Sequence, residues 1–289
     1  MTASQHMIQA GGLRFRTLVA GPPSGELVLM LHGFPEGAES WSAQLDALAD
    51  AGFLAVAPDM RGYGMSDAPP SVDDYEIDRL VEDVENLIRA LGRTDAHIAG
   101  HDWGALVAWF FASRRPAMTR TLTALSVGHP AAVVDAARND PDQRERSRYI
   151  VLFLQEGKAE EVLSADGMQR LRAMFGMGPN PDAVPRGFVD HFAGSLARPG
   201  RLTAALNYYR ANFGKGAAWA ALAHQVQVSA PTTLVWGDQD PALGRVAVDA
   251  TAGLMRGPYA LTVLEGAGHW LQHERPTEIV RSLMERVIH

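Results

Sequence analysis

The chain has 289 residues and a formal net charge of −7, with acidic and basic side chains spread along its length. Because no Lys/Arg cluster occurs, nucleic acids and anionic membranes are not expected partners. The lack of cysteine excludes disulfides and thiolate metal sites. The N-terminus is polar without an apolar signal segment, and no apolar run of about 18 residues occurs, so we expect a soluble, cytoplasmic protein without a membrane span.

Compact apolar runs, typical of buried strands, alternate with helical segments in the first part of the chain. Residues 26–31 and 53–57 are such runs. Between residues 78 and 91 apolar side chains recur at helical spacing, and Gly92 ends the pattern. Strands that alternate with helices predict a mainly parallel sheet with helices on both faces.

A turn with the sequence His32-Gly33-Phe34-Pro35 follows the first of these strands. A turn at this place can direct a backbone N–H toward a site above the sheet. We therefore expect the N–H of Phe34 to be one donor of an oxyanion hole. The alternative is a plain loop, since Gly and Pro are common in turns.

The most informative segment is Gly100-His101-Asp102-Trp103-Gly104, between a predicted strand at 95–99 and an apolar helix at 105–112. It has the frame of the nucleophile elbow G-x-S-x-G, with Asp102 in place of serine. An aspartate, with an unperturbed pKa of about 3.9, is ionised at neutral pH. It suits attack on an sp³ carbon of an epoxide or alkyl halide, which leaves an ester on the enzyme. The N–H of Trp103 is the expected second oxyanion donor, and the alternative is an ordinary N-cap aspartate.

The strand pattern disappears between residues 129 and 226, where helical stretches dominate. It returns with strand-like runs at 231–236 and 259–264. We therefore predict an α/β core formed by residues 1–128 and 227–289, with a helical cap inserted at 129–226.

Both late strands lead into glycine-containing turns that carry candidate catalytic groups. Asp238 and Asp240 lie in the first turn, and either carboxylate could orient a histidine. His269 lies in the second turn, and its unperturbed pKa near 6.5 suits a general base at neutral pH. Because Asp102 also follows a predicted strand, we expect these groups to meet at one edge of the sheet.

Together these segments resemble the soluble epoxide hydrolases of the α/β-hydrolase superfamily. The matching motifs are His32–Glu36 with Trp41, Asp59–Ser66, Gly100–Gly104, and Gly266–Trp270 followed by Gln272, Glu274 and Pro276. The resemblance implies an α/β-hydrolase fold with a mostly parallel eight-stranded sheet. It also implies that Asp102 is the nucleophile, Asp240 the acid and His269 the base, in the chain order usual for this fold, and that no metal or other cofactor is needed.

Epoxide opening leaves an alkoxide that needs an acid, and this family supplies it from two cap tyrosines. The segment 206–210 resembles the second tyrosine segment, with Tyr209 in register and Tyr208 as its rival. The segment 148–156 resembles the first and implies Tyr149. Substrate contacts are expected from a wider set, His32, Trp41, His101, Phe153 and Trp270.

Two other functions are compatible with the same fold. A haloalkane or haloacid dehalogenase shares the aspartate nucleophile, but Phe34 and Trp103 stand where many such enzymes have Asn or Arg. A non-catalytic ligand-binding protein is the other alternative, since fold does not fix function. The resemblance favours an epoxide hydrolase that converts a small-molecule epoxide and water to a vicinal diol. We expect it to be a monomer or homodimer.

Overall fold

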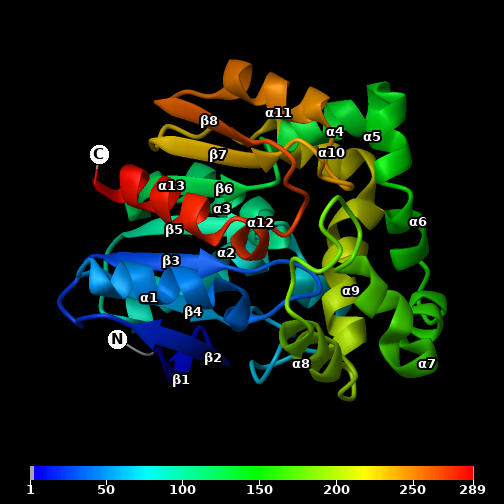
Figure 1. Ribbon diagram of the computed structural model, residues 1–289, viewed down its shortest axis with the longest axis horizontal. Coiled ribbons are helices and arrows are strands. Elements are labelled where there is room, and N and C mark those ends of the chain that lie inside the picture. Colours follow the sequence, from blue (N-terminus) through cyan, green and yellow to red (C-terminus); the bar gives the residue numbers. More distant parts are fainter. Residues whose placement is uncertain (1–2, 289) are drawn as a thin grey trace.

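The computed structural model describes residues 3–288 and is built around one eight-stranded sheet (Figure 1). The strands lie in the order β1-β2-β4-β3-β5-β6-β7-β8. β2 pairs antiparallel with both β1 and β4, and all other neighbours are parallel. The prediction of a mostly parallel eight-stranded sheet is therefore confirmed.

Five of the eight strands correspond to the apolar runs predicted from the sequence, and the other three were not predicted individually. They are β1 (Ser4–Ala10), β2 (Leu13–Ala20), β3 (Leu27–Leu31), β4 (Leu54–Pro58), β5 (Ala96–His101), β6 (Thr119–Leu125), β7 (Thr232–Gly237) and β8 (Tyr259–Leu264). Every residue of β3, β4, β5 and β7 is buried. Parallel strands covered on both faces are expected to be apolar throughout, and this is why their runs do not alternate.

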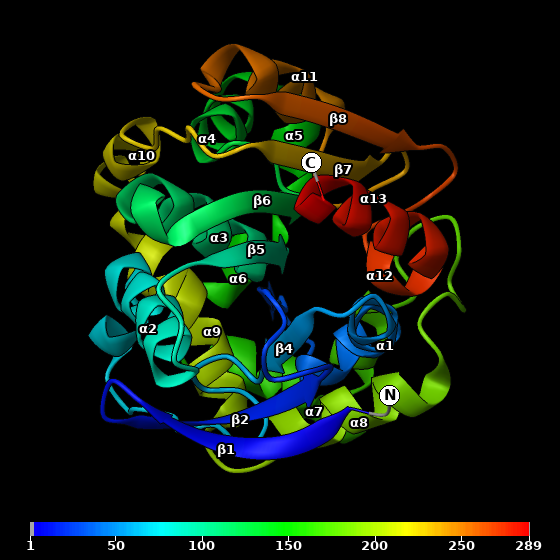
Figure 2. The same ribbon diagram turned by 90° about the vertical axis from the view of Figure 1, so that its left-hand side faces the viewer.

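Helices cover both faces of the sheet (Figure 2). The apolar side chains of α1 (Ser42–Asp50) and α13 (Pro276–Ile288) share one core cluster with one face of the central strands. Those of α2 (Ile77–Ala90) and α3 (Trp103–Arg114) pack on the opposite face. α2 and α3 correspond to the helices predicted at 78–91 and 105–112.

The segment between β6 and β7 contains only helices within the described residues. These are α4 (Pro130–Asn139), α5 (Pro141–Arg146), α6 (Tyr149–Phe153), α7 (Lys158–Met174), α8 (Arg186–Leu196), α9 (Arg201–Asn212), the short η4 (Phe213–Lys215) and α10 (Ala217–His224). In Figure 1, α5 to α9 lie beside the carboxyl ends of the parallel strands. The boundaries of the cap at 129 and 226 remain predictions.

Shorter helices complete the core. They are η1 (Ala38–Trp41), η2 (Val72–Tyr75), η3 (Pro116–Met118), α11 (Arg245–Thr251), η5 (Ala252–Leu254) and α12 (Leu271–Glu274). Within residues 3–288, no helix combines the length and the hydrophobicity that a bilayer span requires.

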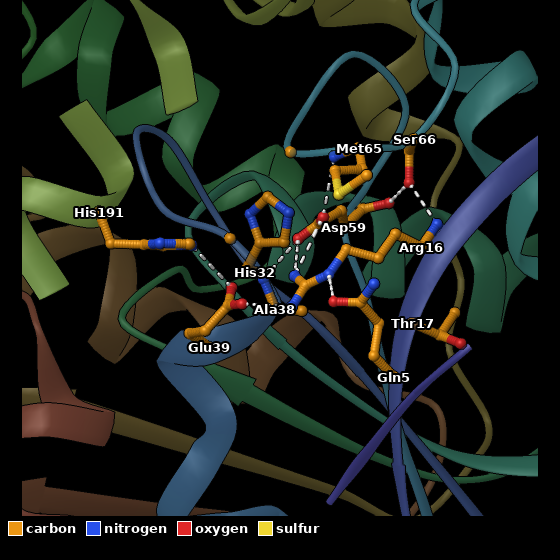
Figure 3. Close-up of polar contacts among 12 residues, drawn as sticks. Gln5, Arg16, Thr17, His32, Ala38, Glu39, Asp59, Met65, Ser66 and His191 are labelled. Carbon is orange, nitrogen blue, oxygen red and sulfur yellow. Dashed lines mark hydrogen bonds and ion pairs between the residues drawn. The ribbon is translucent and has the colours of Figure 1, made fainter. Parts of the chain in front are cut away.

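A buried ion-pair network holds the segment 59–66 against the start of η1 (Figure 3). The Asp59 carboxylate accepts hydrogen bonds from Arg16 Nη1 at 3.2 Å, from the Ala38 amide at 3.0 Å and from the Met65 amide at 3.2 Å. Because Asp59 is 1% exposed, these donors replace the water that a buried carboxylate would otherwise lack. This motif is therefore a structural support for the loop after β3.

Candidate active site

Asp102 occupies a strained turn between β5 and α3, with φ 52° and ψ −117°. Non-glycine residues rarely adopt positive φ, and such strain is concentrated at functional sites. Two glycines that pack against this turn, one within it and one in the loop after β3, leave no room for a side chain. A Cβ on Gly104 would lie 2.1 Å from the Leu31 carbonyl oxygen, and one on Gly33 would lie 2.4 Å from the Asp102 Cβ. Glycine is therefore required at both positions, because the backbone of the predicted elbow lies too close to the loop after β3 to admit a Cβ.

One backbone donor already contacts the carboxylate of Asp102. The N–H of Phe34 donates to Asp102 Oδ1 at 2.8 Å. The amide of Trp103 makes no hydrogen bond to this carboxylate in the part of the chain described. It lies at the first residue of α3, where an N–H has no partner within the helix. The N–H of Phe34 is therefore already positioned to donate to a negative charge that develops on Oδ1.

His269 lies between two carboxylates. Its Nδ1 is 2.8 Å from Asp240 Oδ2, and its Nε2 is 3.7 Å from Asp102 Oδ2. The other oxygen of Asp240, Oδ1, accepts the amides of Ala242 at 2.7 Å and Leu243 at 3.0 Å. Asp240 is thus held by the backbone in the orientation that contacts the imidazole.

Asp238, the other candidate acid, forms a hydrogen bond elsewhere. Its Oδ1 accepts the amide of Gly266 at 2.8 Å and so stabilises the turn that precedes His269. The backbone carbonyl of Asp240 also accepts a hydrogen bond from the side chain of Arg146 in the cap. The geometry therefore favours Asp240 as the partner of the histidine.

The two carboxylates change the protonation of His269. Burial disfavours the charged imidazolium, but Asp240 and Asp102 outweigh burial and raise the pKa of His269 well above its ordinary value. Burial also opposes the charge of Asp240, but His269 and two backbone amides hold the pKa of that carboxyl below its usual value. The two carboxylates therefore favour the protonated form of the imidazole.

Tyr149 and Tyr209 reach the same site from the cap. The ring of Tyr209 contacts Trp103 at 5.1 Å and Phe153 at 4.9 Å between centroids, and lies 6.2 Å from the Tyr149 ring. Burial, followed by neighbouring groups that include the Asp102 carboxylate, raises the pKa of both phenols. Both hydroxyls therefore remain protonated donors at neutral pH.

Tyr208 points elsewhere, although it is adjacent to Tyr209. Its hydroxyl donates to the carbonyl oxygen of Arg61 at 2.7 Å, and its ring is fully buried. Tyr209 lines the cavity above Asp102, and the side chain of Tyr208 links α9 to the core instead.

A cavity of about 250 Å³ lies between the core and the cap. Its core wall consists of Phe34, Asp102, Pro241, Ala242, His269 and Trp270. Its cap wall consists of Arg146, Tyr149, Leu152, Phe153, Val162, Leu163, Arg170, Ala173, Met174, Met177 and Tyr209. The wall is mostly apolar, with Asp102 and His269 on its core side and Tyr149 and Tyr209 on its cap side. Phe153 and Trp270 line it as expected.

Three expected substrate contacts are placed differently. His32 is fully buried and fixes its own loop, with Nδ1 donating to the Gly33 carbonyl and Nε2 accepting the Met60 amide, both at 2.9 Å. Trp41 packs in the core on the face of the sheet covered by α1 and α13. His101 lies behind His269 and contacts its backbone carbonyl. Strand and loop direction turn these side chains away from the cavity, so they support its walls.

A buried network around Glu36 was not anticipated as part of the site. Its carboxylate lies 2.9 Å from His101 Nδ1 and accepts Gln272 Nε2 at 2.8 Å and His273 Nε2 at 3.1 Å. The other nitrogen of His101, Nε2, donates to the backbone carbonyl of His269 at 2.8 Å. Burial opposes the charge of Glu36, but the two histidines outweigh burial and hold its pKa well below the ordinary value. The sequence contained Glu36 and Gln272 in its motifs but no signal that they meet.

Arg146 and Arg170 on the cap wall were also not anticipated. Neither residue belongs to a local motif, and the helical pattern of the cap does not indicate which of its arginines face the core. Their place on the wall follows from how the cap helices pack.

Known proteins resemble this chain over almost its whole length. The family model for the alpha/beta hydrolase fold matches residues 26–276. Epoxide hydrolase A of Mycobacterium tuberculosis is 35% identical, over 98% of this chain and 96% of that protein. Epoxide hydrolase 3 of Xenopus tropicalis is also 35% identical, over 96% of this chain and 77% of that protein.

Solved structures agree with these relatives. The crystal structure of epoxide hydrolase A from Mycobacterium thermoresistibile has a TM-score of 0.86 and 32% identity, and covers 99% of this chain and 98% of that one. A Bacillus megaterium epoxide hydrolase in complex with an inhibitor has a TM-score of 0.87 and 27% identity, and covers 98% of this chain and 100% of that one. The chain belongs to the α/β-hydrolase fold family and, within it, to the epoxide hydrolases.

Proposed function

We propose that the protein converts small-molecule epoxides and water to vicinal diols through an ester on Asp102. One observation carries the proposal. A carboxylate nucleophile, a histidine paired with a buried acid, and two protonated phenols line the same apolar cavity. A serine hydrolase has no use for the two phenols. An epoxide, by contrast, needs an acid on its oxygen and a nucleophile on its carbon at the same time.

Ring opening uses groups from both walls. Asp102 Oδ2 attacks an epoxide carbon, and the bond between that carbon and the ring oxygen breaks. Tyr149 and Tyr209 donate hydrogen bonds to this oxygen, and one phenol transfers its proton and regains it from solvent. The pKa of each phenol is raised mainly by burial, so the donors are protonated when the alkoxide forms. Asp102 Oδ1, on the Phe34 amide, becomes the ester carbonyl oxygen.

Alkylation of Asp102 then changes the charge beside His269. The new ester is neutral, so one of the two carboxylates that raise the pKa of His269 is lost. His269 can release its proton and act as a base toward water, while Asp240 continues to orient it. The resulting hydroxide adds to the ester carbon, the negative charge develops on Oδ1, and the Phe34 and Trp103 amides stabilise it. When this intermediate collapses, the bond between the ester carbon and the substrate oxygen breaks, and that oxygen takes the proton of the added hydroxyl. The diol then leaves, and Asp102 is again a carboxylate.

The test removes the proposed base, His269, and measures the mass of the intact protein. The His269→Gln variant is mixed with a panel of epoxides and alkyl halides. Intact-protein mass spectrometry should show a gain equal to the full mass of an epoxide, because the ester forms but is not hydrolysed. The matched control, His269→Gln with Asp102→Asn, should show no gain. An alkyl group gained without its halogen would indicate a dehalogenase. Absence of any adduct, together with ligand-induced stabilisation, would indicate a binding protein and contradict the proposal.

Isotopic labelling checks the ester route independently. Because water attacks the ester carbon of Asp102, a single turnover of the unmodified enzyme in H₂¹⁸O should place the label in Asp102. The diol from that first turnover should be unlabelled. Label in the diol from the first turnover would show direct attack of water on the epoxide and would exclude the ester.

A further inference from the structure

One segment of the cap packs on the core directly beside the proposed acid and base. This segment, the cap loop of residues 176–181, lies between α7 and α8. A Cβ on Gly268 would lie 3.1 Å from Pro179 Cδ, and one on Gly178 would lie 3.9 Å from Gly268 Cα and 3.9 Å from Pro241 Cδ. Gly268 immediately precedes the base and Pro241 immediately follows the acid, so the cap loop touches both segments that carry them.

Asn180 forms the polar part of this contact. Its Nδ2 donates to the Gly266 carbonyl at 3.1 Å and to Glu274 Oε2 at 2.8 Å. A side-chain NH₂ has two hydrogens, and a carbonyl and a carboxylate are both acceptors. The amide therefore matches its two neighbours, whereas an aspartate at this position would offer neither of them a hydrogen.

Glu274 in turn holds the backbone on either side of His269. Its Oε2 accepts the Gly268 amide at 2.8 Å, and its Oε1 accepts the Trp270 amide at 3.1 Å. Asn180 thus adds a donor from the cap to a carboxylate that already binds two amides of the core. Because hydrogen bonds are directional, a shift of Glu274 would move the peptide groups before and after the imidazole.

We propose that Asn180 is a positioning residue for hydrolysis of the ester, because it fixes the backbone around His269 through Glu274. This inference rests on the proposed function and deepens it. Ring opening uses Asp102 and the cap tyrosines and needs no base, whereas hydrolysis needs the imidazole close to a water molecule. A misplacement of about 1 Å can cost about 10²-fold in rate, so even a small shift of this backbone is measurable.

The experiment measures the two halves of the reaction separately. Rapid-quench mass spectrometry at saturating epoxide follows the formation and the decay of the ester on Asp102. In Asn180→Ala, decay should slow about fivefold, the effect of one typical hydrogen bond, and formation should stay within about twofold. Asn180→Asp keeps the size of the side chain but places a second carboxylate beside Glu274. It should slow decay further, and added salt should reduce the extra effect.

Asp182→Ala is the matched control in the same segment of the cap. Asp182 is exposed, and its side chain forms no hydrogen bond or ion pair with any of residues 3–288. Both steps should keep their rates in this variant.

A double variant tests whether the effect passes through the base. In His269→Gln the base is absent, so the slow residual decay of the ester should be the same with and without Asn180→Ala. Slowing by the same factor in both backgrounds would overturn the inference. Equal slowing of formation and decay in Asn180→Ala, or unchanged decay, would also overturn it. Absence of an ester in both the unmodified enzyme and His269→Gln would instead contradict the proposed function.

Discussion

The core wall and the cap wall of the cavity hold their functional groups by different means. Asp102 and Asp240 follow the ends of parallel strands, and backbone amides from Phe34, Ala242 and Leu243 hold their oxygens. In the cap wall, ring contacts with the surrounding aromatic side chains hold Tyr149 and Tyr209. Hydrogen bonds are directional, whereas apolar contacts are much less so.

This difference between the two walls suggests separate roles: the core wall for the reaction and the cap wall for the choice of substrate. In the proposed reaction, bonds to Asp102 form and break, which needs fixed distances, and backbone hydrogen bonds in the core provide them. Shape recognition needs apolar area, and the cap provides it through helices whose side chains can differ without disturbing the strand ends. Changes in the core are therefore expected to reduce turnover itself, and changes in the cap to alter which epoxide reacts.

The largest expected effect separates the two acids of the core. Asp240→Asn should reduce the rate of ester hydrolysis about 10⁴-fold, the loss typical when the acid of a triad becomes an amide. Asp238→Asn removes only a contact to the Gly266 amide and should change this rate less than tenfold. Rapid-quench measurement of ester formation and decay checks both. Equal losses in the two variants would contradict the choice of Asp240.

A smaller effect separates the adjacent tyrosines of the cap. Tyr209→Phe and Tyr149→Phe should each slow ring opening about 10²-fold, because each removes a proposed donor to the epoxide oxygen. Tyr208→Phe should leave ring opening within a few-fold. It should reduce the free energy of unfolding by about 1–3 kcal/mol, since it leaves the buried Arg61 carbonyl without its donor.

Two measurements decide this comparison. Stopped-flow tryptophan fluorescence follows ring opening, and urea unfolding gives the change in stability. If Tyr208→Phe slowed ring opening as much as Tyr209→Phe, the hydroxyl of Tyr208 would have to take part in the reaction.

The smallest effect concerns pH. Because the folded state raises the pKa of His269, the protonated imidazole contributes stability that is complete below about pH 6.5 and is lost as pH rises through the raised pKa. Asp102→Asn removes one carboxylate and so lowers the folded-state pKa of His269, and this loss should therefore be smaller and be complete at lower pH. The two proteins should differ at high pH by about 1.4 kcal/mol for each unit of difference in the pKa of His269.

Histidine NMR titration and urea unfolding across the neutral and alkaline range check this prediction. Substitution of Asp238 by Asn, which leaves both neighbours of the imidazole in place, is the control. An unchanged titration of His269 in Asp102→Asn would show that Asp102 does not stabilise the resting imidazolium, and would remove the proposed switch of His269 to a base after alkylation.

The sequence by itself determined the sheet, its flanking helices and the family. Buried strands and tight glycine turns depend on residues that are close together in the chain, so a pattern such as Gly100–Gly104 is informative without knowledge of distant segments. The family resemblance, the mainly parallel sheet and the helical nature of the insertion could all be predicted at this level. The order of the candidate groups along the chain, Asp102, Asp240 and His269, can also be read from the sequence.

Only the tertiary structure decided which of several neighbouring side chains faces the cavity. Tyr208 and Tyr209 are adjacent, yet one donates to the carbonyl of Arg61, 147 residues away, and the other lines the cavity. For the same reason, His32, Trp41 and His101 lie behind the walls, and Arg170 has no hydrogen-bond or ion-pair partner among residues 3–288. Side-chain direction depends on contacts between segments far apart in the sequence, and these form only when the cap packs on the core.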